Sequence, residues 1–338
     1  NIMCGILGFS SNRVSFNAER FRQNIQILNH RGPDHNDYWL SADEKNFMGF
    51  ARLAIMDLSP LGNQPMCSSS KEFRIIFNGE IYNHLDLKKT LIKLGYEFNS
   101  RSDTEVLLNS YIEWGENCLQ KLEGMFAFAI CDLRKQELII ARDRFGEKPL
   151  YFAHINKNIA FSSDIRSFKH LNISKEIDDY ALEYYFQELS TPKSNTIWKS
   201  IKKLNAGNYI LFGKNELKQH QYWELNYRDK NNVTLQGAID RCEILLKESV
   251  KRRLVSDVPV GAFLSGGIDS SLVTLFAGMQ SSSKIDTFSV GFEYEKYNEL
   301  PFAKVVANKI KSNHHEIILK PKDLSIVDNL IEEYGEPF

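Results

Sequence analysis

The 338-residue chain lacks the features that mark secreted, membrane-spanning and nucleic-acid-binding proteins. It has five cysteines and no Cys-x-x-Cys pair, which argues against a disulfide scaffold or a zinc site and for a reducing cytoplasm. No apolar run approaches the roughly 20 residues of a spanning helix. A net charge of −1 provides no electrostatic attraction for nucleic acid or an anionic membrane. We therefore expect a cytoplasmic protein that binds neither.

What remains is an ordinary globular composition, 43% hydrophobic and 25% charged, in a chain long enough for about two domains. The first two hundred residues contain short apolar runs that indicate strands, among them Gly5–Ser10, Met48–Met56 and Phe73–Phe77. Turn residues and a few amphipathic helices separate these strands. Strands in packed sheets with helices outside them favour an α/β sandwich over a barrel.

The pattern changes after the polar stretch Glu224–Val233. A long helix is predicted at Thr234–Leu254, and three apolar strands then alternate with helices at Val258–Leu264, Asp286–Phe292 and Glu316–Leu319. Such alternation predicts a parallel, doubly wound sheet. The predicted organisation is a first domain over 4–206, a linker over 207–233 and a second domain over 234–338.

Cys4 is the first residue of chemical interest. A cysteine there could be a small buried hydrophobe. However, the apolar run Gly5–Phe9 would place it at the end of a strand. As the first residue of a processed chain, its own α-amine could take the proton from its thiol. That mechanism requires removal of Asn1–Met3, so we expect Met3 to be the initiator and Cys4 to begin the active protein.

The segment Ser265–Ser271 (Ser-Gly-Gly-Ile-Asp-Ser-Ser) follows a predicted strand and opens a predicted helix. Amide groups and the dipole at a helix N-terminus favour an anion. No Gly-Lys-Ser/Thr follows, so this is not the loop that holds phosphates for γ-phosphoryl transfer. A Ser-Gly-Gly turn can also be purely structural. An amide-opening nucleophile joined to a phosphate site suggests that nitrogen is released at one site and used at the other.

Several spaced motifs together resemble the class II glutamine amidotransferase domain. They are Cys4–Ile6, His30–Asp34, Ala51–Ile55, Asn78–Asn83, Ser102–Asp103, Gly124–Phe128, Arg142–Gly146 and Lys148–Tyr151. With Ser265–Ser271 added, the chain resembles the glutamine-hydrolysing asparagine synthetases from Met3 to Phe338. The resemblance implies an N-terminal-nucleophile αββα sandwich followed by a doubly wound parallel-sheet nucleotide-binding domain.

The resemblance also implies roles in glutamine hydrolysis. Cys4 would attack the carboxamide, and the side-chain amide of Asn78 and the backbone N–H of Gly79 would form the oxyanion hole. Arg52 would bind the α-carboxylate, and Asp103, with Glu80 nearby, the α-amino group. Further contacts to glutamine would come from Leu53, Ala54, Ile55 and Met56. Without the resemblance, Arg52, Asn78-Gly79 and Asp103 are equally well an exposed strand arginine, a hairpin turn and a helix cap.

For the second domain, the resemblance implies binding of ATP as its magnesium complex. The pyrophosphate would lie on Ser265, Gly266, Gly267 and Ser270. Leu264 and Val290 would flank the adenine or ribose, and Asp269 would help to hold Mg²⁺. No tightly bound organic cofactor is expected, and the family's habit makes a homodimer the expected assembly.

The preferred function is ATP-dependent transfer of glutamine nitrogen to aspartate through an acyl-adenylate, giving asparagine, AMP and pyrophosphate. Alternatives are another carboxylate acceptor, such as a sugar uronic acid, and a glutaminase or glutamine-sensing module without synthetase activity. A β-lactam synthetase is disfavoured because that family discards the cysteine. Three strands are fewer than the five or six of a usual doubly wound sheet, so we expect the chain to be part of a longer enzyme.

Overall fold

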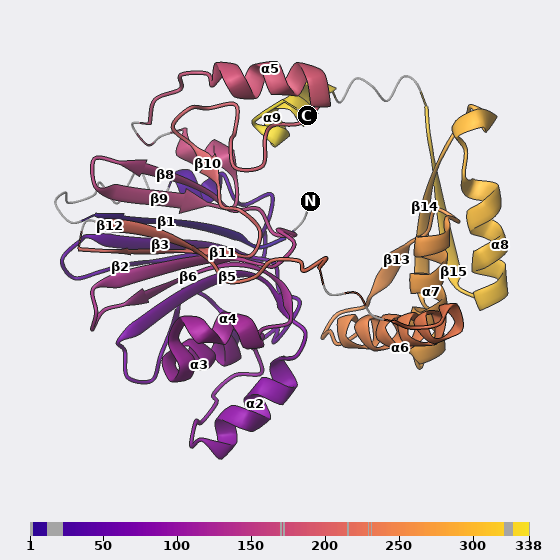
Figure 1. Ribbon diagram of the computed structural model, residues 1–338, viewed down its shortest axis with the longest axis horizontal. Coiled ribbons are helices and arrows are strands. Elements are labelled where there is room, and N and C mark those ends of the chain that lie inside the picture. The colour runs from indigo at the N-terminus through magenta and orange to yellow at the C-terminus, as the bar shows by residue number, and fades with distance from the viewer. Residues whose placement is uncertain are drawn as a thin grey trace. The chain divides into compact units, whose positions relative to one another are not determined.

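The computed structural model describes residues 3–11, 23–169, 171, 173–214, 216–228, 230, 232–320 and 327–337. The chain divides into two compact units (Figure 1). The first unit comprises residues 1–225 together with 333–338, and the second comprises residues 226–332. Each unit has its own sheets and its own hydrophobic core, so each is described by itself.

The first unit contains two six-stranded sheets in which every pairing is antiparallel. One sheet has the order β10-β8-β9-β1-β3-β2, with bounds β1 (Gly5–Ser11), β2 (His35–Leu40), β3 (Asn46–Arg52), β8 (Tyr151–Ile155), β9 (Asn158–Ser162) and β10 (Lys202–Lys203). The other has the order β12-β11-β7-β6-β5-β4, with bounds β4 (Met66–Cys67), β5 (Phe73–Ile81), β6 (Gly124–Asp132), β7 (Glu137–Arg142), β11 (Asn208–Gly213) and β12 (Glu216–Gln221).

Alternation along the strands builds the layers of this unit. Ile76 of β5 packs with Ile6 and Phe50 between the sheets, whereas its neighbours Ile75 and Phe77 point to the opposite face. That face is covered by α2 (His84–Lys93), α3 (Asp103–Trp114) and α4 (Cys118–Lys121). On the outer face of the other sheet, Leu7 and Phe47 pack against Ile25, within the helical residues 23–26. The predicted αββα sandwich is therefore confirmed.

Local signals fix where the helix α3 begins and ends. The Ser102 side chain caps it by accepting a hydrogen bond from the Thr104 N–H at 3.1 Å, and Gly115 ends it with a φ of +57°. Asp103 is thereby held in the first turn. The remaining helical elements of the unit are α5 (Asp179–Glu188) and the 3₁₀ turns η1 (Pro60–Gly62), η2 (Gly115–Asn117) and η3 (Ile165–Phe168).

The predicted linker over 207–233 differs from the structure. It contains β11, whose Ile210 and Phe212 are buried in the core between the sheets, and β12, which pairs with β11. β12 is an edge strand of mostly exposed, polar residues. Such residues suit a strand with one free edge, and for the same reason they read as a linker in the sequence. The chain therefore remains in the first unit until beyond Gln221.

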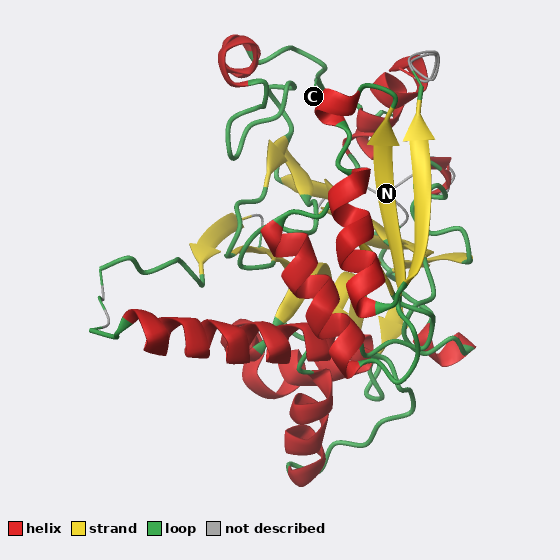
Figure 2. Cartoon of the chain, turned by 90° about the vertical axis from the view of Figure 1, so that its right-hand side faces the viewer, coloured by secondary structure: helices red, strands yellow, loops and turns green. Residues whose placement is uncertain are grey.

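The second unit contains a parallel sheet with the order β13-β14-β15. Figure 2 shows the two longer strands as arrows that point the same way. Helices α7 and α8 supply the crossovers that parallel strands need. The bounds are α6 (Leu235–Arg253), β13 (Gly261–Phe263), α7 (Ile268–Gln280), β14 (Asp286–Phe292), η4 (Glu295–Tyr297), α8 (Leu300–Ile310), β15 (Asn313–Leu319) and α9 (Val327–Tyr334), which reaches into the first unit. The predicted parallel sheet is confirmed.

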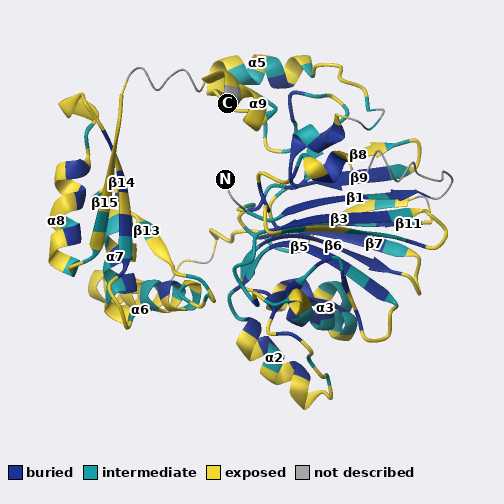
Figure 3. Ribbon diagram, turned by 180° about the vertical axis from the view of Figure 1, so that it is seen from behind, coloured by how far each residue is buried: buried dark blue, intermediate teal, exposed yellow. Residues whose placement is uncertain are grey.

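The two units differ in how much they bury. The sheets of the first unit are mostly buried, whereas the strands and helices of the second are largely exposed (Figure 3). The second unit's cores are small and centre on Val250, Phe276 and Ile285, and on Leu264 with Ala303. Within the described part of the chain, none of the helices has both the length and the apolar character needed to cross a membrane.

Candidate active site

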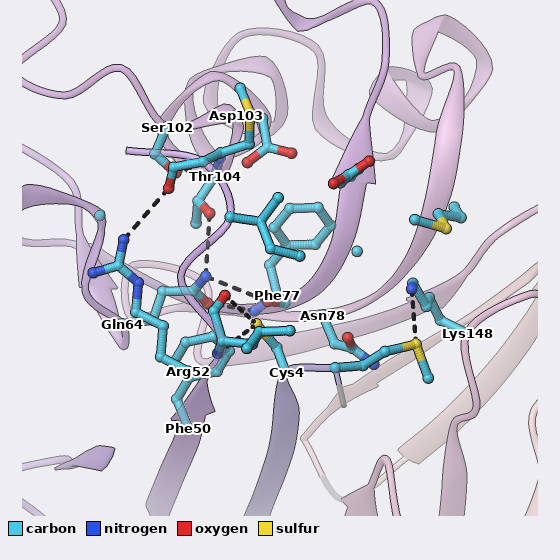
Figure 4. Close-up of a pocket in the computed structure, with 18 residues that line it drawn as sticks. Cys4, Phe50, Arg52, Gln64, Phe77, Asn78, Ser102, Asp103, Thr104 and Lys148 are labelled. Carbon is cyan, nitrogen blue, oxygen red and sulfur yellow. Dashed lines mark hydrogen bonds between the residues drawn. The ribbon is translucent and has the colours of Figure 1, made fainter. Parts of the chain in front are cut away.

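One cavity in the first unit gathers nearly all the residues predicted to bind glutamine (Figure 4). It lies where the start of β1, the loop after β3, the end of β5 and the start of α3 meet. The predicted residues that line it are Cys4, Arg52, Leu53, Ile55, Met56, Asn78, Gly79, Glu80 and Asp103. Ala54 does not line it. Its N–H instead donates to the Asp34 carboxylate at 2.7 Å, which anchors the loop.

The sulfur of Cys4 is held by the backbone of Leu53. The Leu53 N–H donates to Sγ at 3.3 Å, and the thiol donates to the Leu53 carbonyl at 3.4 Å. Burial raises the pKa of this thiol, and the Asp103 carboxylate acts in the same direction. The Leu53 hydrogen bond and the positive charges of Lys148 and Arg52 oppose that rise in pKa. A thiol whose pKa is raised needs a nearby base before it can attack.

Asn78 and Gly79 lie inside the strand β5 and not in a hairpin turn. Asn78 is buried, and its Nδ2 donates to Ser163 Oγ at 3.5 Å. The same oxygen accepts a hydrogen bond from the Ile6 N–H at 3.2 Å, so Ser163 links the amide of Asn78 to the strand that follows Cys4. A Cβ at Gly79 would lie 2.1 Å from the Met125 carbonyl oxygen, so β6 leaves room only for glycine.

Arg52 is buried and is not the exposed strand arginine of the simpler interpretation. Its Nη1 donates to the Ser59 carbonyl at 3.1 Å and to Asn63 Oδ1 at 2.6 Å. Its Nη2 donates to the carbonyls of Met56 and Asp57. All four acceptors are uncharged oxygens, so these bonds hold the loop after β3 without neutralising the guanidinium. Against the effect of burial, Arg52 helps to lower the pKa of the nearby Asp57 carboxyl group. None of these four hydrogen bonds of Arg52 goes to a carboxylate, however, so the guanidinium can still bind one in the cavity.

Asp103 is a buried carboxyl group at the first turn of α3. Burial raises its pKa to about 6, although hydrogen bonds from backbone N–H groups, including that of Ile81 at 2.9 Å, act against the rise. Within the described residues, no cation lies within ion-pair distance of it. A buried, ionised carboxylate without a cation is costly, and the α-ammonium group of an amino acid would relieve that cost.

Among the lining residues that were given no role from the sequence, Gln64 and Lys148 carry polar groups into the site. Gln64 is buried, and its Oε1 accepts from the Phe77 N–H at 2.6 Å. Its Nε2 donates to the Phe77 carbonyl at 3.3 Å and to Thr104 Oγ1 at 3.1 Å. The side chain thus joins the strand that carries Asn78 to the helix that carries Asp103. The other residue is Lys148, which is also buried. The only sequence signals were the Gln-Pro pair and the motif around Lys148, and neither specifies these contacts.

In the second unit, the predicted phosphate loop lies between β13 and α7. Leu264 is buried, and its N–H donates to the Phe288 carbonyl at 2.9 Å. Ser265 and Ser270 lie hydroxyl to hydroxyl at 2.9 Å, and the Gly267 N–H donates to Ser265 Oγ at 3.3 Å. Gly266 has a φ of +83°, and a Cβ there would lie 2.6 Å from the Ala303 nitrogen. The loop therefore requires glycine at this position and is closed by its own hydroxyl groups.

The other residues predicted to bind the nucleotide are exposed. Asp269 lies in the first turn of α7, and Val290 lies on β14. In the part of the chain that the structure describes, no group of three or more His, Cys, Asp or Glu side chains is arranged to hold a metal ion. Asp269 is thus a single carboxylate beside the loop. Any Mg²⁺ there would take further ligands from the phosphates.

Comparisons with known proteins find two family domains in the chain. The family model described as glutamine amidotransferase domain matches residues 3–223, and the one described as asparagine synthase matches residues 241–338. A Methanocaldococcus jannaschii protein, provisionally named asparagine synthetase (glutamine-hydrolyzing) 2, is 37% identical over 99% of this chain and 69% of its own length. Asparagine synthetase (glutamine-hydrolyzing) 3 of Bacillus subtilis is 33% identical over 98% of this chain and 56% of its own length.

Two further matches are a relative with a different kind of name and a solved structure of low sequence identity. A Gibberella zeae protein named amidase chry2 is 34% identical over 78% of this chain and 39% of its own length. The solved glutamine phosphoribosylpyrophosphate amidotransferase of B. subtilis is similar in fold, with a TM-score of 0.50 and 16% identity over 93% of this chain and 65% of its own. The domain matches and the relatives together show that the chain belongs to the glutamine-hydrolysing asparagine synthetase family.

Proposed function

We propose that the first unit hydrolyses glutamine at Cys4 and supplies ammonia to an ATP-dependent ligase reaction. The observation that supports this proposal is the shared cavity. A thiol, a buried arginine and a buried carboxylate without a cation line it together, beside the amide of Asn78. The arginine and the carboxylate complement the two charges of a free amino acid, which are one carboxylate and one ammonium. The thiol and amide suit attack on a carboxamide.

The reaction follows from these groups. Once Cys4 is the first residue, its α-amine takes the thiol proton, and the sulfur attacks the carboxamide carbon of glutamine. The negative oxygen of the tetrahedral intermediate is stabilised by the Asn78 side-chain amide and the Gly79 N–H. The protonated amine returns its proton to the leaving nitrogen, ammonia departs, and a thioester remains. Water then hydrolyses the thioester to glutamate and restores the thiol.

The proposed use of the ammonia rests on the second unit and on the relatives. The loop Ser265–Ser271 opens the helix α7, where backbone N–H groups favour the phosphates of MgATP. ATP would convert an acceptor carboxylate into an acyl-adenylate with release of pyrophosphate. Ammonia would then displace AMP. Aspartate is the proposed acceptor, in keeping with the names of the relatives. A second carboxylate acceptor, such as a sugar uronic acid, is the alternative.

Replacement of the nucleophile tests the first half of the proposal. Cys4→Ala should abolish ammonia release from glutamine and leave glutamine binding nearly unchanged, because only the covalent step needs sulfur. Ammonia release by coupled assay and binding by calorimetry measure the two. Cys67→Ala, at an exposed cysteine outside the cavity, is the matched control. Hydrolysis that survives in the Cys4 variant would contradict the assignment.

The acceptor is tested separately in the natural protein that contains this chain. Pyrophosphate release with glutamine and MgATP should depend on aspartate, and Cys4→Ala should retain it when free ammonia replaces glutamine. Release that depends on uronic acids and not on aspartate would select the alternative acceptor. Glutamine hydrolysis without pyrophosphate release for any carboxylate would favour a glutaminase or a glutamine-sensing module.

A further inference from the structure

Lys148 is a buried cation to which the proposed reaction gives no role. Its side chain is 6% exposed and lines the same cavity as Cys4. Its Nζ donates to the Met3 sulfur at 3.0 Å (Figure 4). Within the described residues, this is the one hydrogen bond of the Lys148 side chain, and no carboxylate lies within 4.0 Å of its Nζ. A buried ammonium whose partner is a thioether is poorly compensated.

The rest of the Lys148 residue is held firmly. Its backbone N–H donates to the buried Asp143 carboxylate at 3.0 Å, and its carbonyl accepts a hydrogen bond from Arg142 Nε at 2.7 Å. The position of the side chain is therefore set by a fixed backbone. Only its far end rests on Met3, the residue bonded to Cys4. Removal of Met3 takes that partner away and creates a new α-amine on Cys4, within the cavity that Lys148 lines.

We propose that the ammonium of Lys148 keeps the α-amine of Cys4 unprotonated after Met3 is removed, so that this amine can act as the base. The proposal rests on the proposed function, in which the amine takes the thiol proton. Lys148 acts through Cys4 and not on glutamine, and is therefore a positioning residue. Two positive charges at the same buried cavity repel each other, so the amine releases its proton more readily.

The surrounding charges support this direction. Arg31 contacts the Cys4 backbone, where its Nε donates to the Cys4 carbonyl at 3.2 Å, and it adds a second positive charge. The opposing carboxylates are Glu80, Glu147 and, nearer the thiol, Asp103. Burial lowers the pKa of Lys148 itself, while Glu80 and the Cys4 thiolate act to raise it. The Lys148 charge also favours the Cys4 thiolate.

The test is the pH profile of glutamine hydrolysis by chain that begins at Cys4. In Lys148→Met the acidic limb of the kcat profile should move to higher pH by about one unit, because the α-amine then holds its proton more tightly. At pH values below the limb, this displacement is a tenfold lower kcat. At high pH the parent and the variant should have equal kcat. Saturating glutamine is used because it covers Asp103, whose pKa of about 6 would otherwise contribute to the limb. Lys148→Arg should restore the parental limb.

A second measurement needs no turnover. The rate of acylation of the Cys4 α-amine, followed by mass spectrometry against pH, should show the same one-unit displacement in Lys148→Met. Lys93→Met, on the exposed end of α2, is the control for loss of a lysine elsewhere. If the parent does not hydrolyse glutamine, the proposed function fails, and this labelling profile still decides the role of Lys148.

Three results would overturn the inference. The first is an unmoved acylation profile in Lys148→Met. The second is a raised KM for glutamine at every pH with an unmoved limb, which would show that Lys148 binds substrate. The third is an equal loss of kcat at every pH in both Lys148→Met and Lys148→Arg, which would indicate damage to packing.

Discussion

The two units place their predicted sites in different surroundings. In the first, a cavity is enclosed by strands and a helix that are themselves buried, and its polar side chains have named partners. In the second, the loop predicted to bind phosphate is formed, but the strands of its sheet are exposed, with Phe263 at 83% and Ile317 at 59%. The chain spans between about half and about two thirds of the length of the first relatives it matches.

The contrast shows what a site needs beyond its motif. The hydrogen bonds of Ser265, Gly267 and Ser270 join residues at most five positions apart, so local sequence accounts for much of the closure of the loop Ser265–Ser271. The cavity proposed to bind glutamine instead depends on contacts between segments far apart in the chain, such as Ile6 with Ser163 and Gln64 with Thr104. Substitutions should therefore act on the first site through its supporting contacts. In the second unit they should act locally.

The largest effect is expected at the oxyanion hole. Asn78→Ala should lower kcat for glutamine hydrolysis by about 10²–10³-fold, because an uncharged donor to the developing oxyanion is lost. Steady-state ammonia release measures this loss. Asn117→Ala, at an exposed asparagine before α4 with no side-chain cap, is the control. A loss of less than threefold would return Asn78 to a purely structural role.

A smaller loss is expected from the supporting contacts. Gln64→Ala leaves the N–H and carbonyl of Phe77 without their side-chain partner, so kcat/KM for glutamine should fall about 10–100-fold. Both kcat and KM should change, since the residue holds Asn78 and Asp103 together. Gln219→Ala on the edge strand β12 is the control. If only thermal stability changed, Gln64 would support the fold and not the site.

Asp103 should show a trade between stability and binding. Its pKa is about 6 in the folded protein, above its ordinary value of 3.8, so the stability contributed by the protonated form is present below pH 4 and is lost as the pH rises through 6. Above pH 6, Asp103→Asn should therefore have a free energy of unfolding larger than that of the parent by on the order of 2 kcal/mol. Below pH 4 the two free energies should be equal. Calorimetry across this range measures the difference. The same variant should raise the KM for glutamine, and a parent that is more stable at every pH would refute the argument.

The smallest effect tests the independence of the second unit. Gly266→Ala puts a side chain at a φ of +83° against the backbone of Phe302 and Ala303, which should destabilise the second unit by about 1–3 kcal/mol. Glutamine hydrolysis should change by less than twofold. Hydrogen exchange of α7 and ammonia release measure the two. Gly278→Ala, at a helix position where the nearest atom to the added Cβ is 3.9 Å away, is the control.

The fold was largely predictable because alternating strands and a change to helix–strand alternation are properties of local sequence. The predicted linker over 207–233 was wrong for a physical reason. An edge strand such as β12 faces solvent on its free edge, so its Glu, Lys and Gln residues read as linker. The αββα layering could not be derived from periodicity alone, and it came from the resemblance.

The site was predictable mainly through the resemblance. Residue chemistry alone singled out Cys4, whereas the roles of Asn78 and Asp103 came from the family motifs, and the structure places all three at one cavity. The sequence did not identify the roles of Gln64 or Lys148, because each depends on a partner far along the chain, Thr104 for one and Met3 for the other. Ala54 remains a predicted contact to glutamine. Its N–H is engaged by Asp34, which no local pattern reveals.

Residues 333–338 are grouped with the first unit, although the second unit's residues separate them in sequence from 1–225. Glu336 of this segment forms an ion pair with Lys203 at 2.8 Å, and Glu333 forms one with Arg166 at 3.0 Å. A single proteolytic cut within 226–332 would therefore leave the first unit as a nicked molecule of two pieces. High salt would weaken both ion pairs and so favour separation of the two pieces.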